Sequence, residues 1–146
     1  MKIFDEEGFI DSDVQDILYE LGNVGLGMVS ITIGKIMGVR MHIGVPSVVQ
    51  VNENLLERLC KIKDGVSFQQ IFQKTIDGAM HIIMSEHFLE KVIAKMSGEN
   101  YEEYDEQDKL SVLQEFSNMI CAAYLKAIGQ YTGIRLYVKP SYINIH

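Results

Sequence analysis

Apolar residues recur at helical spacing along two long segments, residues 13–37 and 108–131. Apolar positions three and four residues apart indicate helices that bury one side. Acidic and hydroxyl side chains at 11–13 offer N-cap chemistry before the first segment. Gly38 and Gly133 follow the two segments, and glycine commonly ends a helix because it adopts a left-handed backbone without strain. The sequence therefore predicts two long helices of similar construction.

The remaining apolar segments are shorter and rich in β-branched residues. Pro46 lies within the first of them and places it at a sheet edge or a bend, and Asp77-Gly78 is typical of a two-residue hairpin turn. Strand composition of this kind predicts strands over residues 39–51, 66–76, 79–85 and 134–138. A shorter helix is predicted over residues 86–96, stopped by Gly98, and residues 53–63 are interpreted as a short helix or a structured crossover.

Polar residues on the two long helices repeat at a fixed distance of 95 positions. A repeat of this kind is informative about the whole fold. Packing explains a repeated apolar residue, but it does not require the same Glu and Asn in the same phase. The matching pairs are Asp16 and Ser111, Leu18 and Leu113, Glu20 and Glu115, Asn23 and Asn118, Ile33 and Ile128, Gly34 and Gly129, Gly38 and Gly133, and Arg40 and Arg135.

The repeated polar residues fall on one narrow side of each helix, because each residue turns the helix by about 100°. We call Asp16, Glu20 and Asn23 the first strip, and Ser111, Glu115 and Asn118 the second strip. The small residues Gly27 and Ala122 continue the two strips and suit the close approach of another protein. One such strip is most simply a solvated helix face. Two strips in register favour a functional surface.

These elements predict a single α/β (α+β) domain over residues 1–146, with a pseudo-two-fold internal repeat and long helices packed on an antiparallel sheet. The first repeat covers about 13–97, an acidic linker about 99–108 and a shortened second repeat about 109–146. The linker is interpreted as solvated, with a docking surface for a basic partner as the alternative. The second repeat lacks the hairpin, which leaves a sheet edge uncovered and predicts pairing between two copies.

Composition narrows the class of partner. The net charge of −7 argues against nucleic acid or an anionic membrane surface as a partner, since both favour basic proteins. Cys60 and Cys121 lie in apolar runs without metal-ligand spacing, which indicates buried thiols in a reduced, cytoplasmic protein. We expect no metal site, no targeting segment, and an apolar stretch over 24–37 that falls short of a membrane span. Gly22, Gly25 and Gly27 are attributed to close helix packing, because a nucleotide-binding loop would need a preceding strand.

The doubled pattern resembles the signature of the CheC, CheX and FliY phosphatases of chemotaxis, Asp/Ser-x3-Glu-x2-Asn-x22-Pro. The first strip and Pro46 match it in full, with 22 residues between Asn23 and Pro46. The second strip matches as well, but Pro140 comes one residue early and Ser141 holds the expected position. Two copies are most similar to CheC or to the CheC-like part of FliY, whereas CheX carries a single functional copy in its second half.

The resemblance implies an enzyme that hydrolyses the aspartyl phosphate of a CheY-like response regulator. Asn23 and Asn118 would orient the attacking water, as a neutral amide does in GTP hydrolysis. Glu20 and Glu115 would pair with the lysine of the partner's active site. The Mg²⁺ would belong to the phosphorylated partner, so the protein would need no cofactor of its own.

A second hypothesis from the same resemblance is a non-catalytic adaptor that keeps the repeated scaffold. It would bind a response regulator, a flagellar switch component or the receptor deamidase CheD, the known partner of CheC. The shortened second half favours this alternative. The two retained Glu/Asn pairs favour the phosphatase, because a scaffold has no need of both amides.

Overall fold

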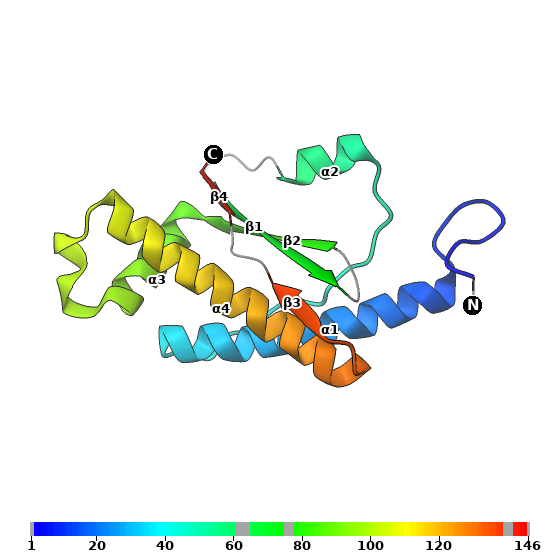
Figure 1. Cartoon of the computed structure of the whole chain (residues 1–146), viewed down its shortest axis with the longest axis horizontal. Coiled ribbons are helices and arrows are strands. Elements are labelled where there is room, and N and C mark those ends of the chain that lie inside the picture. The colour runs from blue at the N-terminus through cyan, green and yellow to red at the C-terminus, as the bar shows by residue number, and fades with distance from the viewer. Residues whose placement is uncertain (1, 61–64, 75–77, 139–141, 146) are drawn as a thin grey trace.

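Helices dominate the fold, as a computed structural model of residues 2–60, 65–74, 78–138 and 142–145 shows (Figure 1). The two longest helices, α1 and α4, pack against each other, and α4 also contacts the sheet. The elements in chain order are α1 (Ser12–Met37), α2 (Glu53–Cys60), β1 (Gly65–Lys74), β2 (Gly78–Ser85), α3 (Glu86–Ser97), the 3-10 helix η1 (Gly98–Glu103), α4 (Glu106–Thr132), β3 (Leu136–Val138) and β4 (Tyr142–Ile145). The predicted class, long helices with an antiparallel sheet, is confirmed.

The two long helices begin and end as their flanking residues predict. The Asp11 carboxylate caps α1 by accepting a hydrogen bond from the Asp13 amide at 3.0 Å. Gly38 and Gly133 both adopt a left-handed backbone, with φ of 68° and 75°, directly after α1 and α4. A side chain is strained in that conformation, so glycine fixes both ends.

β1 is the central strand of the sheet, because it pairs with β2 on one side and with β3 and β4 on the other. All of these pairings are antiparallel. The β1–β2 register joins Phe72 to Gly78. Gly78 therefore belongs to β2 and not to a two-residue turn, so that detail of the hairpin prediction is wrong, and residues 75–77 lie outside the described residues.

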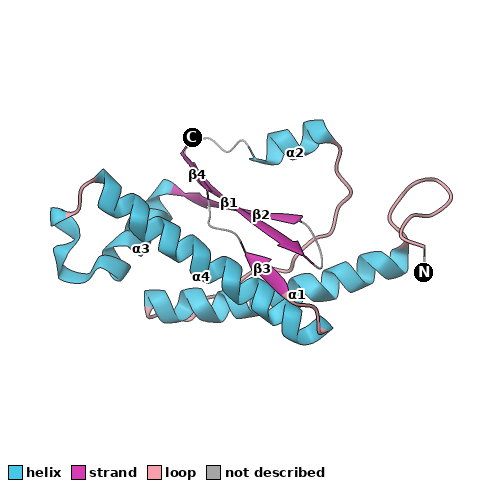
Figure 2. Cartoon of the chain, viewed as in Figure 1, coloured by secondary structure: helices cyan, strands magenta, loops and turns pink. Residues whose placement is uncertain are grey.

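The predicted strand over residues 39–51 is also wrong. This segment is extended but joins no strand among the described residues (Figure 2). It runs back along α1 instead. Met41 accepts a hydrogen bond from Ser30 Oγ at 2.7 Å, Val48 accepts one from Gln15 at 3.1 Å, and the Gln50 side chain bonds Ile10 and Gly8. Side chains of α1 thus take polar groups that a strand would use for pairing, and Pro46 has no N–H to donate.

β4 was not predicted from the sequence. It pairs antiparallel with β1, from Val66 with Ile145 to Gln69 with Tyr142. Its alternating Tyr142-Ile143-Asn144-Ile145 pattern is the signal that would have found it. In the described part of the chain, the edges of the sheet are therefore the outer side of β2 and, opposite it, the outer sides of β3 and β4.

The acidic run over 99–108 is structured and not a plain linker. Its first part forms η1. Its last part caps α4: Asp105 accepts a hydrogen bond from the Asp108 amide at 2.8 Å, and Asp108 accepts one from the Asp105 amide at 3.2 Å. Negative side chains in the first turn of a helix are stabilised by its dipole. The predicted start of the helix at 108 is therefore two residues late.

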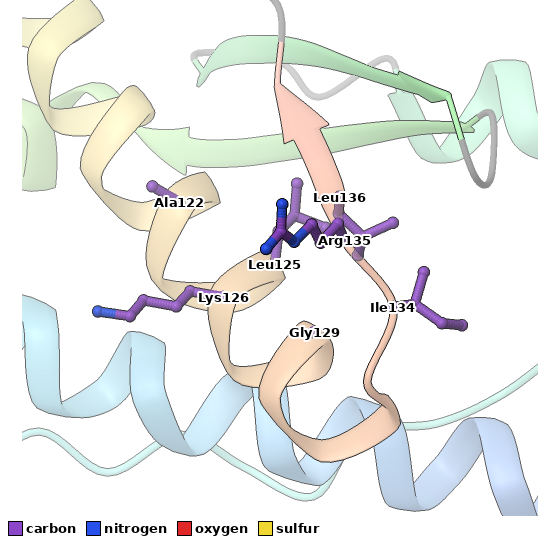
Figure 3. A pocket seen from close by; sticks show the side chains of 7 residues that line it. All are labelled: Ala122, Leu125, Lys126, Gly129, Ile134, Arg135 and Leu136. Carbon is purple, nitrogen blue, oxygen red and sulfur yellow. The ribbon is translucent and has the colours of Figure 1, made fainter.

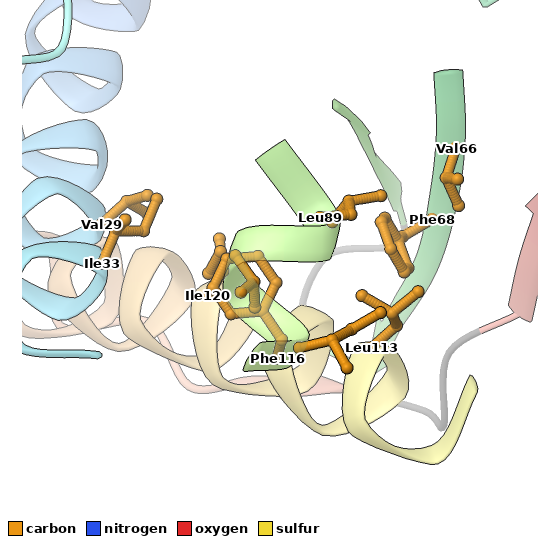
Figure 4. Close-up of a cluster of buried hydrophobic side chains, with 10 residues drawn as sticks. Val29, Ile33, Val66, Phe68, Leu89, Leu113, Phe116 and Ile120 are labelled. Atoms are coloured by element: carbon orange, nitrogen blue, oxygen red, sulfur yellow. The ribbon is translucent and has the colours of Figure 1, made fainter. Parts of the chain in front are cut away.

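The hydrophobic core joins α1, β1, α3 and α4 (Figure 4). Phe68 of β1 and Phe116 of α4 are fully buried, and the Phe116 ring lies 6.4 Å from that of Phe88 with a tilt of 56°. Cys121 is buried as predicted, and burial raises the pKa of its thiol from 9.0 to about 11. The side chain of Cys60 lies outside the described part.

α1 is less buried than its apolar composition suggests. By length and composition it could cross a bilayer, since an 18-residue window has a mean hydropathy of 1.3. Only 17% of the window is buried against the rest of the chain, and Ile17 and Ile31 are among its exposed apolar residues.

Candidate functional site

The second strip lies on the solvent side of α4. Ser111, Glu115 and Asn118 are exposed, and so is Ala122 one turn beyond Asn118. Most of the buried residues of α4 fall on the opposite side of the helix: Leu113, Phe116, Ser117, Ile120 and Ala127. Cys121 and Leu125 are also buried but lie closer to the phase of the strip, beyond Asn118. The helix thus presents one polar face outward while its apolar side builds the core.

The first strip is arranged in the same way on α1. Asp16, Glu20 and Asn23 are exposed, and the residues buried on the other side are Gly25, Val29 and Ile33. All four predicted site residues, the two Glu and the two Asn, are therefore accessible from solvent. None is turned into the core.

α1 and α4 meet through the sides that face away from the strips. Gly25 is buried at the crossing, where a Cβ atom would lie 2.3 Å from the Tyr124 ring. Only a glycine leaves room for this close approach. Because the contact is opposite the strips, the strips face away from each other and form two separate surfaces. The structure does not bring Asn23 and Asn118 into one site.

Three glycines near the first strip have different surroundings. Gly25 is explained by helix packing. Gly22 is explained by Pro46, because a Cβ atom added at Gly22 would lie 3.4 Å from the Pro46 Cβ. Gly27, which continues the strip, meets nothing within 4 Å. The prediction that close packing explains all three is therefore wrong for Gly27. The space beside it is open to an approaching molecule.

Pro46, the last residue of the first signature, lies against α1 beside Asn23 because it packs on the preceding Gly22. Pro140 and Ser141, the candidates for the second copy, lie outside the described residues. Sequence reasoning placed Pro46 in a strand and missed this contact.

The two carboxylates of the strips are available for a partner. Neither Glu20 nor Glu115 takes part in an ion pair within the described part of the chain. Ser111 is occupied locally, since its Oγ donates to the Gln107 carbonyl at 3.0 Å. This bond agrees with a supporting role for Ser111 in its own helix.

Exposed apolar side chains flank both strips. Ile17 and Ile31 on α1 are 48% and 52% exposed, and Met119 beside Asn118 is 37% exposed. Apolar area beside a few polar groups is typical of a protein-docking surface.

Other hollows of the molecule lie away from the four site residues. An apolar groove of about 740 Å³ runs between β2 and the two long helices and is lined by residues such as Leu21, Met84 and Ile128. Within the described ranges, no cluster of His, Cys, Asp or Glu could hold a metal ion. His42 and His81 are exposed.

Three solved structures share this fold at low sequence identity, which makes the likeness one of fold alone. Thermotoga maritima FliY superposes with a TM-score of 0.74 and 19% identity, over 92% of this chain and 69% of that one. A putative chemotaxis protein from Desulfovibrio vulgaris Hildenborough gives a TM-score of 0.67 at 14% identity, over 87% of this chain and 76% of its own. The chemotaxis protein CheX from Desulfovibrio desulfuricans gives a TM-score of 0.65 at 15% identity, over 87% of this chain and 78% of its own.

A family match adds sequence evidence to the likeness of fold. Residues 66–142 match the family described as chemotaxis phosphatase CheX. This range is more than half of the chain and contains the second strip, while the first strip lies outside it. The predicted resemblance to the CheC, CheX and FliY phosphatases is thereby confirmed at the level of the family, and the chain belongs to the chemotaxis phosphatase CheX family.

Proposed function

We propose that the protein hydrolyses the aspartyl phosphate of a CheY-like response regulator, with Asn23 and Asn118 orienting the attacking water. The observation that carries this proposal is the exposure of both Glu/Asn pairs on helix faces opposite the α1–α4 contact. A rigid helix can insert such a side chain into another protein's active site. Membership of the chemotaxis phosphatase CheX family supports the reaction class.

The amides suit this chemistry because an aspartyl phosphate is already a reactive anhydride. The partner supplies Mg²⁺ and a lysine that neutralise the phosphate oxygens, so the missing component is a water in line with the leaving carboxylate. A carboxamide accepts a hydrogen bond from that water without taking its proton, and positioning alone accelerates such a reaction. Asn23 and Asn118 have this role.

Glu20 and Glu115 act as anchors. Each lies three residues before its Asn, so both side chains project from the same side of the helix. A carboxylate at that position pairs with the partner's active-site lysine and fixes the direction of approach. Neither Glu serves as a general base in this mechanism.

Two working sites, one on each half of an internally repeated fold, complete the proposal. The matching helix ends at Gly38 and Gly133 support the repeat. Cytoplasmic localisation belongs to the proposal too, since a CheY-like partner is a cytoplasmic protein. Binding of CheD and self-association through an uncovered sheet edge stay predictions.

Loss of phosphate from a CheY-type regulator labelled with radioactive phosphate tests the proposal. The wild type is expected to speed the decay, and the double variant Asn23→Ala/Asn118→Ala to return it to the spontaneous rate. Gln130→Ala is the matched control, because Gln130 is an exposed amide on α4 outside the strip. Unchanged decay in the double variant would reject the role of the amides.

The same experiment separates the phosphatase from the adaptor. An adaptor captures the regulator on an affinity resin without changing the rate at which its phosphate is lost. A phosphatase shows faster loss, and the double Asn variant still captures the regulator because Glu20 and Glu115 remain. Capture without any acceleration by the wild type would replace the phosphatase with the adaptor.

A further inference from the structure

Two shallow pockets occupy matching places at the ends of the long helices. One, of about 420 Å³, lies where α4 ends and is lined by Ala122, Gly129 and Arg135 among others (Figure 3). The other, of about 390 Å³, lies where α1 ends and includes Gly34 and Arg40. The lining glycines and arginines differ by 95 positions in both cases, so the repeat extends to these pockets.

The geometry of the helix ends explains the glycines. A Cβ atom on Gly34 would lie 2.8 Å from the Val39 carbonyl oxygen, and one on Gly129 would lie 2.8 Å from that of Ile134. No side chain fits where the chain folds back over the helix. These glycines are therefore repeated for a structural reason, and each forms part of the pocket floor.

The arginines have no such explanation. Arg40 and Arg135 are exposed, and neither has an ion pair or hydrogen bond within the described part of the chain. Arg135 reaches from the segment after α4 over Leu125 (Figure 3). In a chain with a net charge of −7, two unpaired arginines in matching positions are not accounted for by the fold.

The pocket on α4 continues the second strip. Ala122 lies one turn beyond Asn118 and already lines the pocket. At a rise of about 1.5 Å per residue, the lining residue Leu125 lies about 10 Å beyond Asn118 along the helix. The lining residue Gly129 lies about 21 Å beyond Glu115. The pocket is thus too far from Asn118 for its arginine to touch the same phosphate, yet near enough to fall under one docked domain.

We propose that Arg40 and Arg135 each bind a carboxylate on the surface of the phosphorylated regulator whose phosphate the neighbouring strip addresses. The inference rests on the proposed function and adds a second contact to it. An arginine binds a carboxylate through two parallel hydrogen bonds and so fixes direction as well as affinity. With Glu at one end of the docking surface and Arg at the other, the regulator binds in one orientation only: its lysine at the Glu, its carboxylate at the Arg.

Affinity for a CheY-type regulator loaded with beryllofluoride, a mimic of the phosphorylated state, tests the inference without relying on turnover. The double variant Arg40→Ala/Arg135→Ala is expected to raise the Kd about 10-fold, as loss of a charged hydrogen bond does. The double Arg→Lys variant is expected to recover part of the affinity, because it keeps the charge and loses the fork. In the phosphate-loss assay the Arg→Ala change raises KM.

Lys91→Ala/Lys95→Ala is the matched control, since both lysines are exposed on α3 and their loss changes the net charge equally. If the arginine double variant binds as tightly as this control, the inference is overturned. It is overturned as well if the change lowers the unfolding stability but leaves the Kd unchanged, because the arginines would then serve only the helix ends. Unchanged phosphate loss in Asn23→Ala/Asn118→Ala, by contrast, would reject the proposed function and leave the Kd result to stand by itself.

Discussion

α1 and α4 carry the same polar strip on very different supports. α4 buries seven residues, and the chain after it enters the sheet as β3. α1 buries three residues, and the chain after it runs back along the helix without joining the sheet among the described residues. The same Glu and Asn side chains thus project from a rigid helix in one half of the molecule and from a more exposed helix in the other.

This difference matters because a water-orienting amide works only if it is held in place. Displacement by about 1 Å is enough to cost on the order of 100-fold in rate. The core behind Asn118 restrains α4 more strongly than the contacts behind Asn23 restrain α1. The CheX family match covers α4 and not α1, which points to the same helix.

The comparison predicts unequal sites. Asn118→Ala is expected to lower the phosphatase rate far more than Asn23→Ala, with an effect on the order of 100-fold if α4 carries nearly all of the activity. Phosphate loss from a labelled regulator gives both values. If each of the two substitutions instead halves the phosphatase rate, α1 and α4 support their Asn side chains equally well for catalysis.

The contact between the helices is tested by a pair of glycine substitutions on α1. Gly25→Ala places a Cβ 2.3 Å from the Tyr124 ring and is expected to lower the free energy of unfolding by as much as about 3 kcal/mol, the usual range for overpacking. Gly27→Ala meets nothing within 4 Å, so it is expected to raise this free energy by about 0.5–1 kcal/mol through helix propensity. Urea denaturation measures both.

A lower free energy of unfolding for Gly25→Ala together with a higher one for Gly27→Ala would establish that α1 and α4 cross at Gly25. A loss of similar size at Gly27 would mean that α1 packs along its strip side as well, and the open first site would then be wrong. Tyr124→Leu combined with Gly25→Ala is expected to restore part of the lost stability.

The buried side of α4 predicts a dependence of stability on pH that α1 does not share. Burial raises the pKa of the Cys121 thiol to about 11, so the stability that its protonated form contributes is fully present below pH 9 and is lost as the pH rises through 11. The loss is roughly 2–3 kcal/mol. Urea denaturation from pH 8 to 11 is expected to show a flatter profile for Cys121→Ala than for the wild type.

Tyr124 is the control for this titration, because burial raises its pKa as well and its ionisation destabilises the fold in the same direction. Comparing Cys121→Ala with the wild type in a Tyr124→Phe background isolates the thiol. Identical slopes in the two proteins would mean that Cys121 is accessible to water.

The smallest expected effect concerns Ser117, between the strip and the core. Its Oγ is buried and has no hydrogen-bond partner among the described residues, which costs stability. Ser117→Ala is expected to raise the free energy of unfolding by about 1 kcal/mol without changing the phosphatase rate. Ser111→Ala, an exposed serine on the same helix, is the control with an expected change below about 0.5 kcal/mol. A destabilised Ser117→Ala would indicate a partner for that hydroxyl.

Local chemistry made part of the fold predictable. Asp11 before α1 and Gly38 and Gly133 after the long helices act within a few residues, and they ended the helices where expected. Segment 39–51 has the composition of a strand, yet its polar groups bond to α1 and the N-terminal segment, which no local pattern encodes. β4 was missed for the converse reason, since a four-residue strand forms only because β1 offers an edge.

The sequence by itself determined the two helices, the phase of their strips and the family, because helical period and spacing are properties of neighbouring residues. Only the tertiary structure decided that the strips face away from each other, since that depends on Gly25 meeting Tyr124 from another helix. It also placed Pro46 beside Asn23 and formed a pocket around each arginine. Contacts between distant segments depend on how whole elements pack, and that information is not present in any single stretch of the chain.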